Sequence, residues 1–383
     1  MTILELNEIF KVASKNVDYR IDEASKNQVE IFGKIWHEKY FPLGSRPRLQ
    51  SEFKTILNKM HFTIAASTID ERASEPVRVK QGLSKIERSM LTHAHAFRHD
   101  HDEIRDLVVQ TQLAIANKGA DPDGYKQAIK DVENYLMNSI EDAVMGVKAR
   151  LSIIILEALT NEGKFTFTQE NDPGSPYVGE TIDFRMPAEN CGKVGSGNEW
   201  VAGNESKVDP VKEIAEVCLK HKRKKFTKIW VRQETVNFML KTDSYKSYIN
   251  NQLTSPNQPL TLERINAWNK ANGYPEFEVV NFVAGVQTDY HVDDYEPFKE
   301  GMMVFVPETK NGVLGHIETL VPDSKLGMKS DGVSYKDYNR IEVRELRYGE
   351  RENSNYTEIT KGSLTGAPSI EEMANIVSLD TLH

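Results

Sequence analysis

The longest apolar pattern in the sequence runs from Tyr125 to Ala158 and repeats every three or four residues. This spacing places the apolar side chains on one face of an α-helix. At 1.5 Å per residue, a helix of this length spans roughly 55–60 Å, far more than an average globular helix. The stripe consists of Tyr125, Ile129, Val132, Leu136, Ile140, Ala143, Val147, Leu151, Ile155 and Ala158. We therefore expect a spine helix around which the chain packs, not the wall of an active site.

The segments before this helix favour an arm followed by a long hairpin. Residues 1–60 carry short helical patterns that are broken by the Pro and Gly residues of FPLGSRPR, which is typical of an arm. FTIAASTID (62–70) and KIERSMLTHAHAF (85–97) are β-leaning segments, and together they predict an extended β-hairpin loop over 61–105. An isolated two-stranded ribbon is marginal in water, so we expect this hairpin to lie against another chain.

The segments after the helix favour a second, α/β-like unit. Gly163 is expected to end the helix, and KFTFTQ then pairs as a strand with ETIDFRM. The Gly-rich NCGKVGSGN is interpreted as a flexible linker at a domain boundary. Beyond it, helical and strand patterns alternate up to MMVFVPE, and the chain then returns to extended segments such as RIEVRELRYG and NYTEITKG.

Composition excludes several classes of protein. A formal net charge of -9 argues against nucleic-acid binding as the main task, because such binding depends on neutralising phosphates with Lys and Arg. Two cysteines in 383 residues do not make a disulfide framework, so a reducing compartment is expected. The first residues lack the basic start and apolar core of a signal peptide, and no apolar run is long enough to span a membrane.

Four histidines fall within nine residues of LTHAHAFRHDHDEI, at His93, His95, His99 and His101. Strand alternation places them on one face together with Phe97. Zinc needs three or four converging ligands, and no more than two side chains of a single strand converge on one point. We favour a solvated or inter-subunit face, whose imidazoles respond to pH. A metal held by the last two histidines and their neighbouring aspartates is the alternative.

The remaining polar motifs are weaker. KHKRKKFTK (220–228) gathers lysines at a predicted helix C-terminus, which indicates a solvated helix end or a contact with an acidic neighbour or DNA. His291 with Asp293 and Asp294 fits either a turn with surface acids or a hydrolytic metal centre. GKVGSGN does not satisfy the phosphate-loop pattern. The sequence contains no catalytic constellation, so we predict no enzyme, no catalytic residue, no cofactor and no metal.

The order of these segments resembles the major capsid proteins of tailed phages, which have the Hong Kong 97-type fold, and among them the lambda-type family called major capsid protein E. The resemblance runs from about Phe41 to the C-terminus. It rests on RLSIIILEALTNEGKFTF, DPVKEIAEVCLKHKRKKFTKIWVRQETVNFMLK, LERINAWNKANGYPEFEVVN, FKEGMMVFVPE and GAPSIEEMANIVSLDTL.

The resemblance implies an α+β fold with an N-terminal arm (1–60), an extended loop (61–105), a peripheral domain with the spine helix (106–194 and 331–383) and an α/β axial domain (195–330). It implies a structural protein that self-assembles as homo-pentamers and homo-hexamers into the icosahedral shell of a bacteriophage virion. The residues expected to contact a neighbouring subunit are Arg78, Lys80, Lys85, Arg88, His93, His95 and Phe97.

The implied partners are scaffold, portal and decoration proteins and the enclosed double-stranded DNA, which is not bound by sequence, and no membrane is involved. Assembly is expected in the host bacterial cytoplasm. Three alternatives stay open: a cellular encapsulating shell with enzyme cargo, a metal-dependent hydrolase using His99, His101, His291 and Asp293, and a tail-tube or other virion component.

Overall fold

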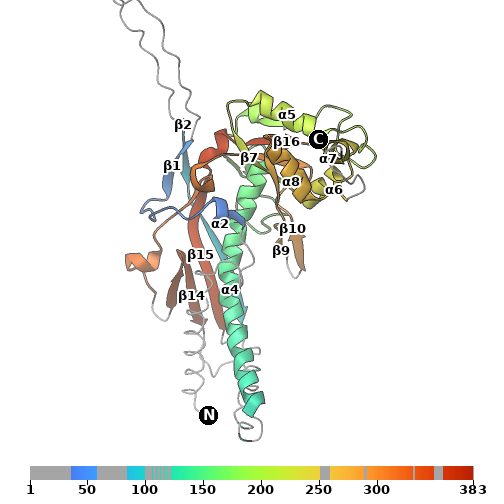
Figure 1. The fold of residues 1–383 in the computed structure, drawn as a ribbon. Helices are drawn as coiled ribbons and strands as arrows, with labels where there is room; N and C mark the ends of the chain where they lie inside the picture. The colour runs from blue at the N-terminus through green and yellow to red at the C-terminus, as the bar shows by residue number, and fades with distance from the viewer. Residues whose placement is uncertain are drawn as a thin grey trace, which may run out of the picture.

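The computed structural model describes residues 36–57, 84–99, 122–250, 259–288, 291–330, 333–348 and 357–382, and single positions at 106, 109, 113, 116 and 119. The fold combines one long helix, a sheet along its side and a helix-covered sheet at its end (Figure 1). The helices are α2 (Trp36–Tyr40), α4 (Pro122–Thr160), α5 (Pro210–Lys220), α6 (Gln233–Met239), α7 (Asp243–Asn250) and α8 (Leu262–Ala271). No helix among the described residues is long and apolar enough to cross a membrane.

The strands form two large sheets and three separate strand pairs. The first sheet has the order β12–β15–β14–β13. The strand β3 also pairs with β15, along the edge opposite to β14. Its strands are β3 (Leu91–His99), β12 (His316–Thr319), β13 (Ser334–Tyr338), β14 (Ile341–Tyr348) and β15 (Thr357–Ser369). The second sheet, in the order β6–β16–β11–β7–β8, contains β6 (Cys191–Lys193), β7 (Phe226–Val231), β8 (Glu276–Val279), β11 (Met302–Pro307) and β16 (Val377–Asp380). The pairs are β1 (Glu52–Leu57) with β2 (Ser84–Ser89), β4 (Lys164–Thr166) with β5 (Thr181–Asp183), and β9 (Ala284–Thr288) with β10 (His291–Tyr295).

The expected spine helix is α4, with 39 residues. Pro122 stands in its first turn, where a missing backbone N–H costs nothing. At the other end Gly163 has a φ of 78°, and its N–H donates to the carbonyl of Ala158 at 2.9 Å, as expected for a glycine that ends a helix. The predicted stripe is buried at Ile140, Ala143, Val147, Leu151, Ile155 and Ala158. The final turns are buried nearly all round, because the second sheet covers them as well.

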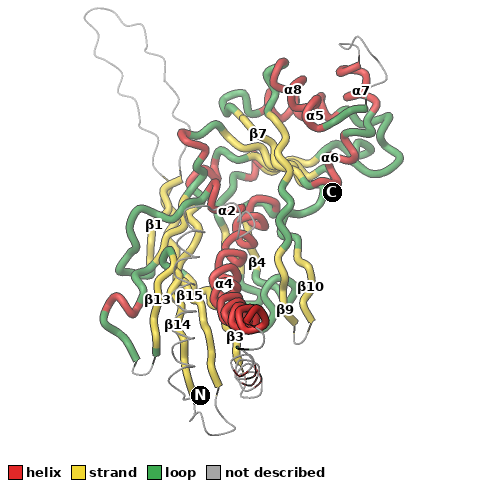
Figure 2. The backbone as a smooth tube through the Cα atoms, turned by 60° about the horizontal axis from the view of Figure 1, so that its bottom comes forward, coloured by secondary structure: helices red, strands yellow, loops and turns green. Residues whose placement is uncertain are grey.

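The first sheet packs against the side of α4, and both views show β15 running alongside the helix (Figures 1 and 2). The approach is closest at two glycines. A Cβ added to Gly362 of β15 would lie 2.6 Å from the carbonyl oxygen of Ala143 in α4. A Cβ added to Gly146 of α4 would lie 2.8 Å from the ring of His95 in β3. Glycine on each element therefore sets how closely the helix and the sheet approach.

The second sheet separates two apolar cores. Along β11 the side chains alternate, so Met302, Val304 and Val306 join the first core, around α4, while Met303 and Phe305 join the second. Helices α5 to α8 cover the second core, as Figure 2 shows. This strand is buried on both faces, which explains why MMVFVP lacks polar alternation.

Two segments pack elsewhere than the sequence-based domain division placed them. Within 195–330, Ala284 and Ile317 belong to the first core, together with the spine helix. Within 331–383, Leu379 belongs to the second core, because β16 inserts between β6 and β11. Hydrophobic pattern marks these segments as buried strands but does not say which core they fill.

The Gly-rich segment predicted as a flexible linker is instead structured. Cys191–Lys193 forms β6, which pairs in parallel with β16. Val194 is 4% exposed and its N–H donates to the carbonyl of Asp380 at 3.0 Å. The prediction was wrong because glycine was taken as a sign of flexibility, whereas here hydrogen bonds to β16 fix the backbone.

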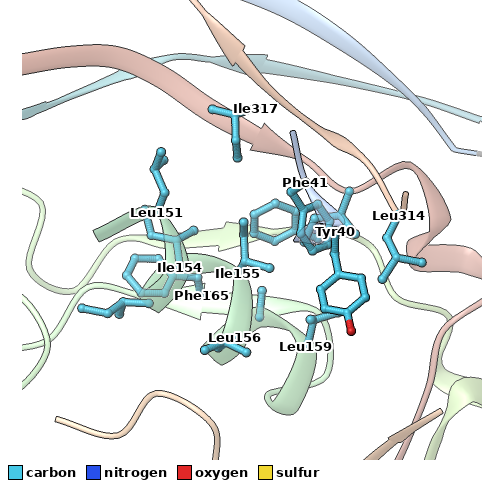
Figure 3. Packing of buried hydrophobic residues seen from close by; sticks show 14 of the residues in the cluster. Tyr40, Phe41, Leu151, Ile154, Ile155, Leu156, Leu159, Phe165, Leu314 and Ile317 are labelled. Carbon is cyan, nitrogen blue, oxygen red and sulfur yellow. The ribbon is translucent and has the colours of Figure 1, made fainter. Parts of the chain in front are cut away.

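The N-terminal segment, expected to be an arm, packs on its own chain from Trp36 onward. Tyr40 and Phe41 lie among side chains of α4 and the stretch that includes Leu314 (Figure 3). Beyond them, isolated bridges tie Leu43 to Ile317 and Arg48 to Leu320. Residues 1–35 of the predicted arm lie outside the described residues.

A half-buried carboxylate fastens this segment to the second sheet. Glu278 of β8 accepts hydrogen bonds from the Tyr40 hydroxyl at 2.6 Å, the Lys39 amine at 2.5 Å and the Lys228 amine at 2.8 Å. Burial by itself would raise the pKa of Glu278, but these donors lower it to about 2. The carboxylate therefore stays ionised and joins α2 to β7 and β8.

Candidate inter-subunit surfaces

The strand with the clustered histidines belongs to the first sheet and not to the extended loop. The predicted strand over 85–97 is interrupted at Met90, which is buried. Before it, β2 pairs with β1, and after it, β3 pairs with β15. The predicted bounds of the extended loop, 61–105, are corrected accordingly. The described strands of this hairpin are β1, which begins at Glu52, and β2, which ends at Ser89, and Leu91–His99 belongs to the first sheet. FTIAASTID lies outside the described residues.

The strand alternation was predicted correctly, but the surface that it faces was not. His93, His95 and Phe97 all lie on the α4 side of the sheet, and the rings of His95 and Phe97 meet edge to face at 4.7 Å. His93 is only 8% exposed within its own chain. α4 therefore already covers this side chain within its own chain, and the expected contact of His93 with a neighbouring subunit stays a prediction. Contacts of the half-buried His95 and Phe97 with a neighbour stay a prediction.

Burial also determines the protonation of these imidazoles. Desolvation, helped by the nearby charge of Arg150, lowers the pKa of His93 to about 4. Desolvation likewise lowers the pKa of His95, although the charge of Asp142 opposes that shift. Both rings are therefore neutral at pH 7 and pack as partly apolar groups.

This burial predicts a loss of stability in acid. The folded chain holds His93 neutral, whereas the unfolded chain binds its proton near pH 6.5, so stability that is complete above pH 6.5 is lost as the pH falls to about 4. A shift of this size corresponds to about 3 kcal/mol of unfolding free energy. Chemical denaturation at a series of pH values should show a flatter acid slope for His93→Gln than for the wild type.

The control is His291→Gln, at an exposed histidine of β10, and it should leave the slope unchanged. Burial also lowers the pKa of His37 to about 3, so His37 likewise reduces the stability of the folded chain in acid. This contribution is present in both variants and in the wild type. Equal slopes for His93→Gln and the wild type would show that His93 is not held neutral.

Of the other predicted contact residues, Arg88 is the best described. Its guanidinium lies 3.9 Å from the centre of the Phe184 ring and donates to the carbonyl of Asp183 at 2.7 Å. Desolvation lowers its pKa to about 10. These contacts fix the base of the β1–β2 hairpin to β5 in the same chain. Lys85 lies on β2 opposite Ile56, while Arg78 and Lys80 lie outside the described residues.

The lysine-rich segment 220–228 divides into two groups. Lys224 points inward, where its amine donates to the side-chain oxygen of Asn190 at 2.6 Å and to the carbonyl of Ala374 at 3.1 Å. Lys220, the last residue of α5, and Lys222, just beyond its end, are exposed. The predicted solvated helix end is therefore confirmed for Lys220 and Lys222. Lys224 and Lys228 instead bond to other segments of the same chain.

The acidic pair lies on a hairpin that the sequence analysis missed. Asp293 and Asp294 belong to β10, paired with β9, where a turn was expected. The available signal was the alternation of Ala284 and Val286 with Gly285 and Gln287 in β9. Glycine and aspartate are rare in strands, so Gly285 and the two aspartates obscured it.

The structure gives no support to the hydrolase alternative. His99 lies on β3 of the first sheet and His291 on the separate β9–β10 hairpin, while His101 lies outside the described residues. Among the residues whose placement is described, no group of three or more His, Cys, Asp or Glu side chains is arranged to hold a metal ion.

The fold can be compared with those of known proteins. No family model and no curated protein matches the sequence. The structure is similar to the crystal structure of a candidate capsid protein from a prophage of E. coli CFT073, with a TM-score of 0.51, 11% identity and coverage of 93% of this chain and 96% of that chain. This likeness establishes the α+β, Hong Kong 97-type capsid fold that the sequence predicted.

Two more distant likenesses were found. The capsid of Myoviridae phage XM1 has a TM-score of 0.44 and 8% identity, with 90% of each chain covered. An encapsulin complex from Synechococcus elongatus has a TM-score of 0.35 and 10% identity, with 92% of this chain and 89% of that chain covered.

Proposed function

We propose that this chain is a major capsid protein of a tailed phage, whose copies assemble as pentamers and hexamers into an icosahedral shell around double-stranded DNA. The observation that carries the proposal is the likeness to the prophage protein, which spans 93% of this chain and 96% of the other at a TM-score of 0.51.

Surfaces left open on the single chain support assembly. Within the described residues, β3 and β13 end the first sheet without a further strand. Open strand edges are an aggregation hazard for a monomer and an assembly device for a shell. The base of the β1–β2 hairpin is anchored by buried Leu57 and Ile86, so the intervening segment 58–83, with Arg78 and Lys80, leaves from a fixed support.

In this proposal the unit built from α5 to α8 surrounds the axis of a capsomer, and the hairpin contacts a neighbouring subunit. The protein belongs to the virion and is assembled in the host bacterium, with scaffold, portal and decoration proteins of the same phage as further partners. The role is structural and requires no catalytic group, cofactor or metal.

The test is negative-stain electron microscopy of the purified chain, with light scattering for mass. We expect closed shells or rings with five- and six-fold symmetry. Shells that carry protein cargo and no nucleic acid after expression in a phage-infected host would favour the encapsulating-shell alternative, and tubes would favour a tail component. A monomer that stays monomeric with the neighbouring phage proteins present would contradict the proposal.

A further inference from the structure

The turn between β13 and β14 carries an arginine at a position that favours glycine. β13 ends at Tyr338 and β14 begins at Ile341, so Asn339 and Arg340 form a two-residue loop. Their φ angles are 49° and 70°. The type I′ loops that suit such hairpins need positive φ at both positions, and Asn-Gly is the usual pair because a side chain strains this backbone. The strain at Arg340 persists only if contacts of its side chain compensate for it.

The side chain of Arg340 reaches two other segments of the chain. Its guanidinium donates to the hydroxyl of Thr319 in β12 at 3.1 Å and to the carbonyl of Gly44 at 2.5 Å. Both acceptor residues are buried. A guanidinium carries several donors in a fixed fork, so this one side chain ties the β13–β14 turn to β12 and to the segment around Gly44.

Residues 42–48, which we call the strap, run along β12 and pair with it through isolated bridges. Near the start of the strap, the Gly44 N–H donates to the carbonyl of Ile317 at 2.9 Å. At its end, the Arg48 N–H donates to the carbonyl of Thr319 at 2.7 Å. The strap is thus attached at two points, and Arg340 adds a side-chain hydrogen bond at the first of them.

The strap leads directly into the β1–β2 hairpin, which leaves from the upper end of the first sheet in Figure 1. The Arg48 guanidinium donates to both carboxylate oxygens of Glu318 in β12, at 2.7 and 3.0 Å. It also lies 5.9 Å from the centre of the Phe53 ring in β1. Because β2 is held separately through Arg88, the position of β1 relative to the first sheet depends on the strap.

We propose that Arg340 is a positioning residue, which holds the strap in place and thereby sets the direction in which the β1–β2 hairpin leaves the subunit. This inference rests on the proposed function, in which the hairpin contacts a neighbouring copy. A hairpin that is already held in one direction loses less conformational freedom on contact, so the hydrogen bond from Arg340 to the strap favours assembly. Glycine at this position would relieve the turn and release the strap, which separates this role from a purely local one.

The experiment compares Arg340→Gly with the wild type in the full-length chain. Thermal melting should change little, because the relief of backbone strain offsets the lost hydrogen bonds. In hydrogen exchange, the Gly44 amide should exchange at least about tenfold faster, while the amides of β1 and β2, which pair with each other, keep their rates. Assembled mass, measured by sedimentation and electron microscopy, should fall at least about fivefold at the concentration where half of the wild type assembles.

The matched control is Asn339→Gly, which relieves the same turn and keeps the arginine. Its Gly44 exchange rate and its assembly should equal those of the wild type. Arg340→Lys keeps the charge but has no fork that reaches both acceptors, so its Gly44 exchange rate and its assembly should lie between those of Arg340→Gly and the wild type. If Arg340→Gly does not fold, Arg340→Lys serves for the same comparison.

The outcomes separate this inference from the proposed function. A Gly44 amide that exchanges at the wild-type rate in both Arg340 variants would overturn the positioning role and leave the capsid function standing. Faster exchange with normal assembly would overturn the link between the strap and the hairpin contact. A large fall in melting, with protection lost throughout the chain, would make Arg340 a general structural residue and overturn the inference. A wild type that forms no rings or shells would overturn the capsid function and, with it, the role in assembly.

Discussion

Replacing Leu151 by aspartate is expected to leave no soluble, folded protein. Leu151 is 1% exposed, lies in the C-terminal half of the spine helix and packs within the first core. A carboxylate there has no partner, and an unpaired buried charge costs several kcal/mol or forces protonation. That loss is comparable with the whole stability of a typical domain, about 5–15 kcal/mol. Ile140→Asp, at a position 4% exposed on the same stripe, should behave alike.

Soluble yield and thermal melting after expression measure this effect. The matched control is Lys130→Asp, an exposed position of the same helix, which tests aspartate in α4 without burying it. It should melt close to the wild type. Normal yield and unchanged melting of Leu151→Asp would show that the stripe does not face a core and would contradict the packing of α4 described above.

Adding a single methyl group at Gly362 is expected to lower the unfolding free energy by about 3 kcal/mol. The new Cβ would lie 2.6 Å from the carbonyl oxygen of Ala143 and 2.9 Å from its carbon. Both atoms belong to the backbone of α4, which cannot move aside without separating the helix from β15. Urea unfolding of Gly362→Ala measures the loss.

Two other glycines give graded controls. Gly146→Ala brings a Cβ to 2.8 Å from the His95 ring, and a side chain can rotate away, so the loss should be smaller. Gly195→Ala meets only the Asn198 amide at 3.8 Å and should change the unfolding free energy by less than about 0.5 kcal/mol. Equal losses of unfolding free energy at all three positions would show that the close approach of α4 and β15 does not determine the cost of the added methyl group.

The regular elements were predictable because their patterns are local. The three-to-four-residue spacing from Tyr125 to Ala158 predicted α4, and Gly163 marked its end. The strand pair β4–β5 and the elements from α5 to β8 also follow the predicted segments. Strands with unusual residues were missed, namely β6 with its glycine and β10 with its two aspartates.

The candidate surfaces were predicted less well. Alternation gave the common face of His93, His95 and Phe97, but no local pattern indicates whether that face meets a solvent, another chain or a helix 50 residues away. The lysines of 220–228 look alike in the sequence, yet Lys224 is held by Asn190 and Ala374 while Lys222 is exposed. Their different roles depend on segments that lie far apart in the chain.

The sequence by itself determined which stretches form helices and strands and which face of each is apolar, because both depend on the order of neighbouring residues. The tertiary structure decided which faces meet. Gly362 against Ala143, β16 between β6 and β11, and Glu278 beside Tyr40 all join residues more than 70 positions apart. Shape and charge select such contacts only after the elements exist, so no spacing along the chain encodes them.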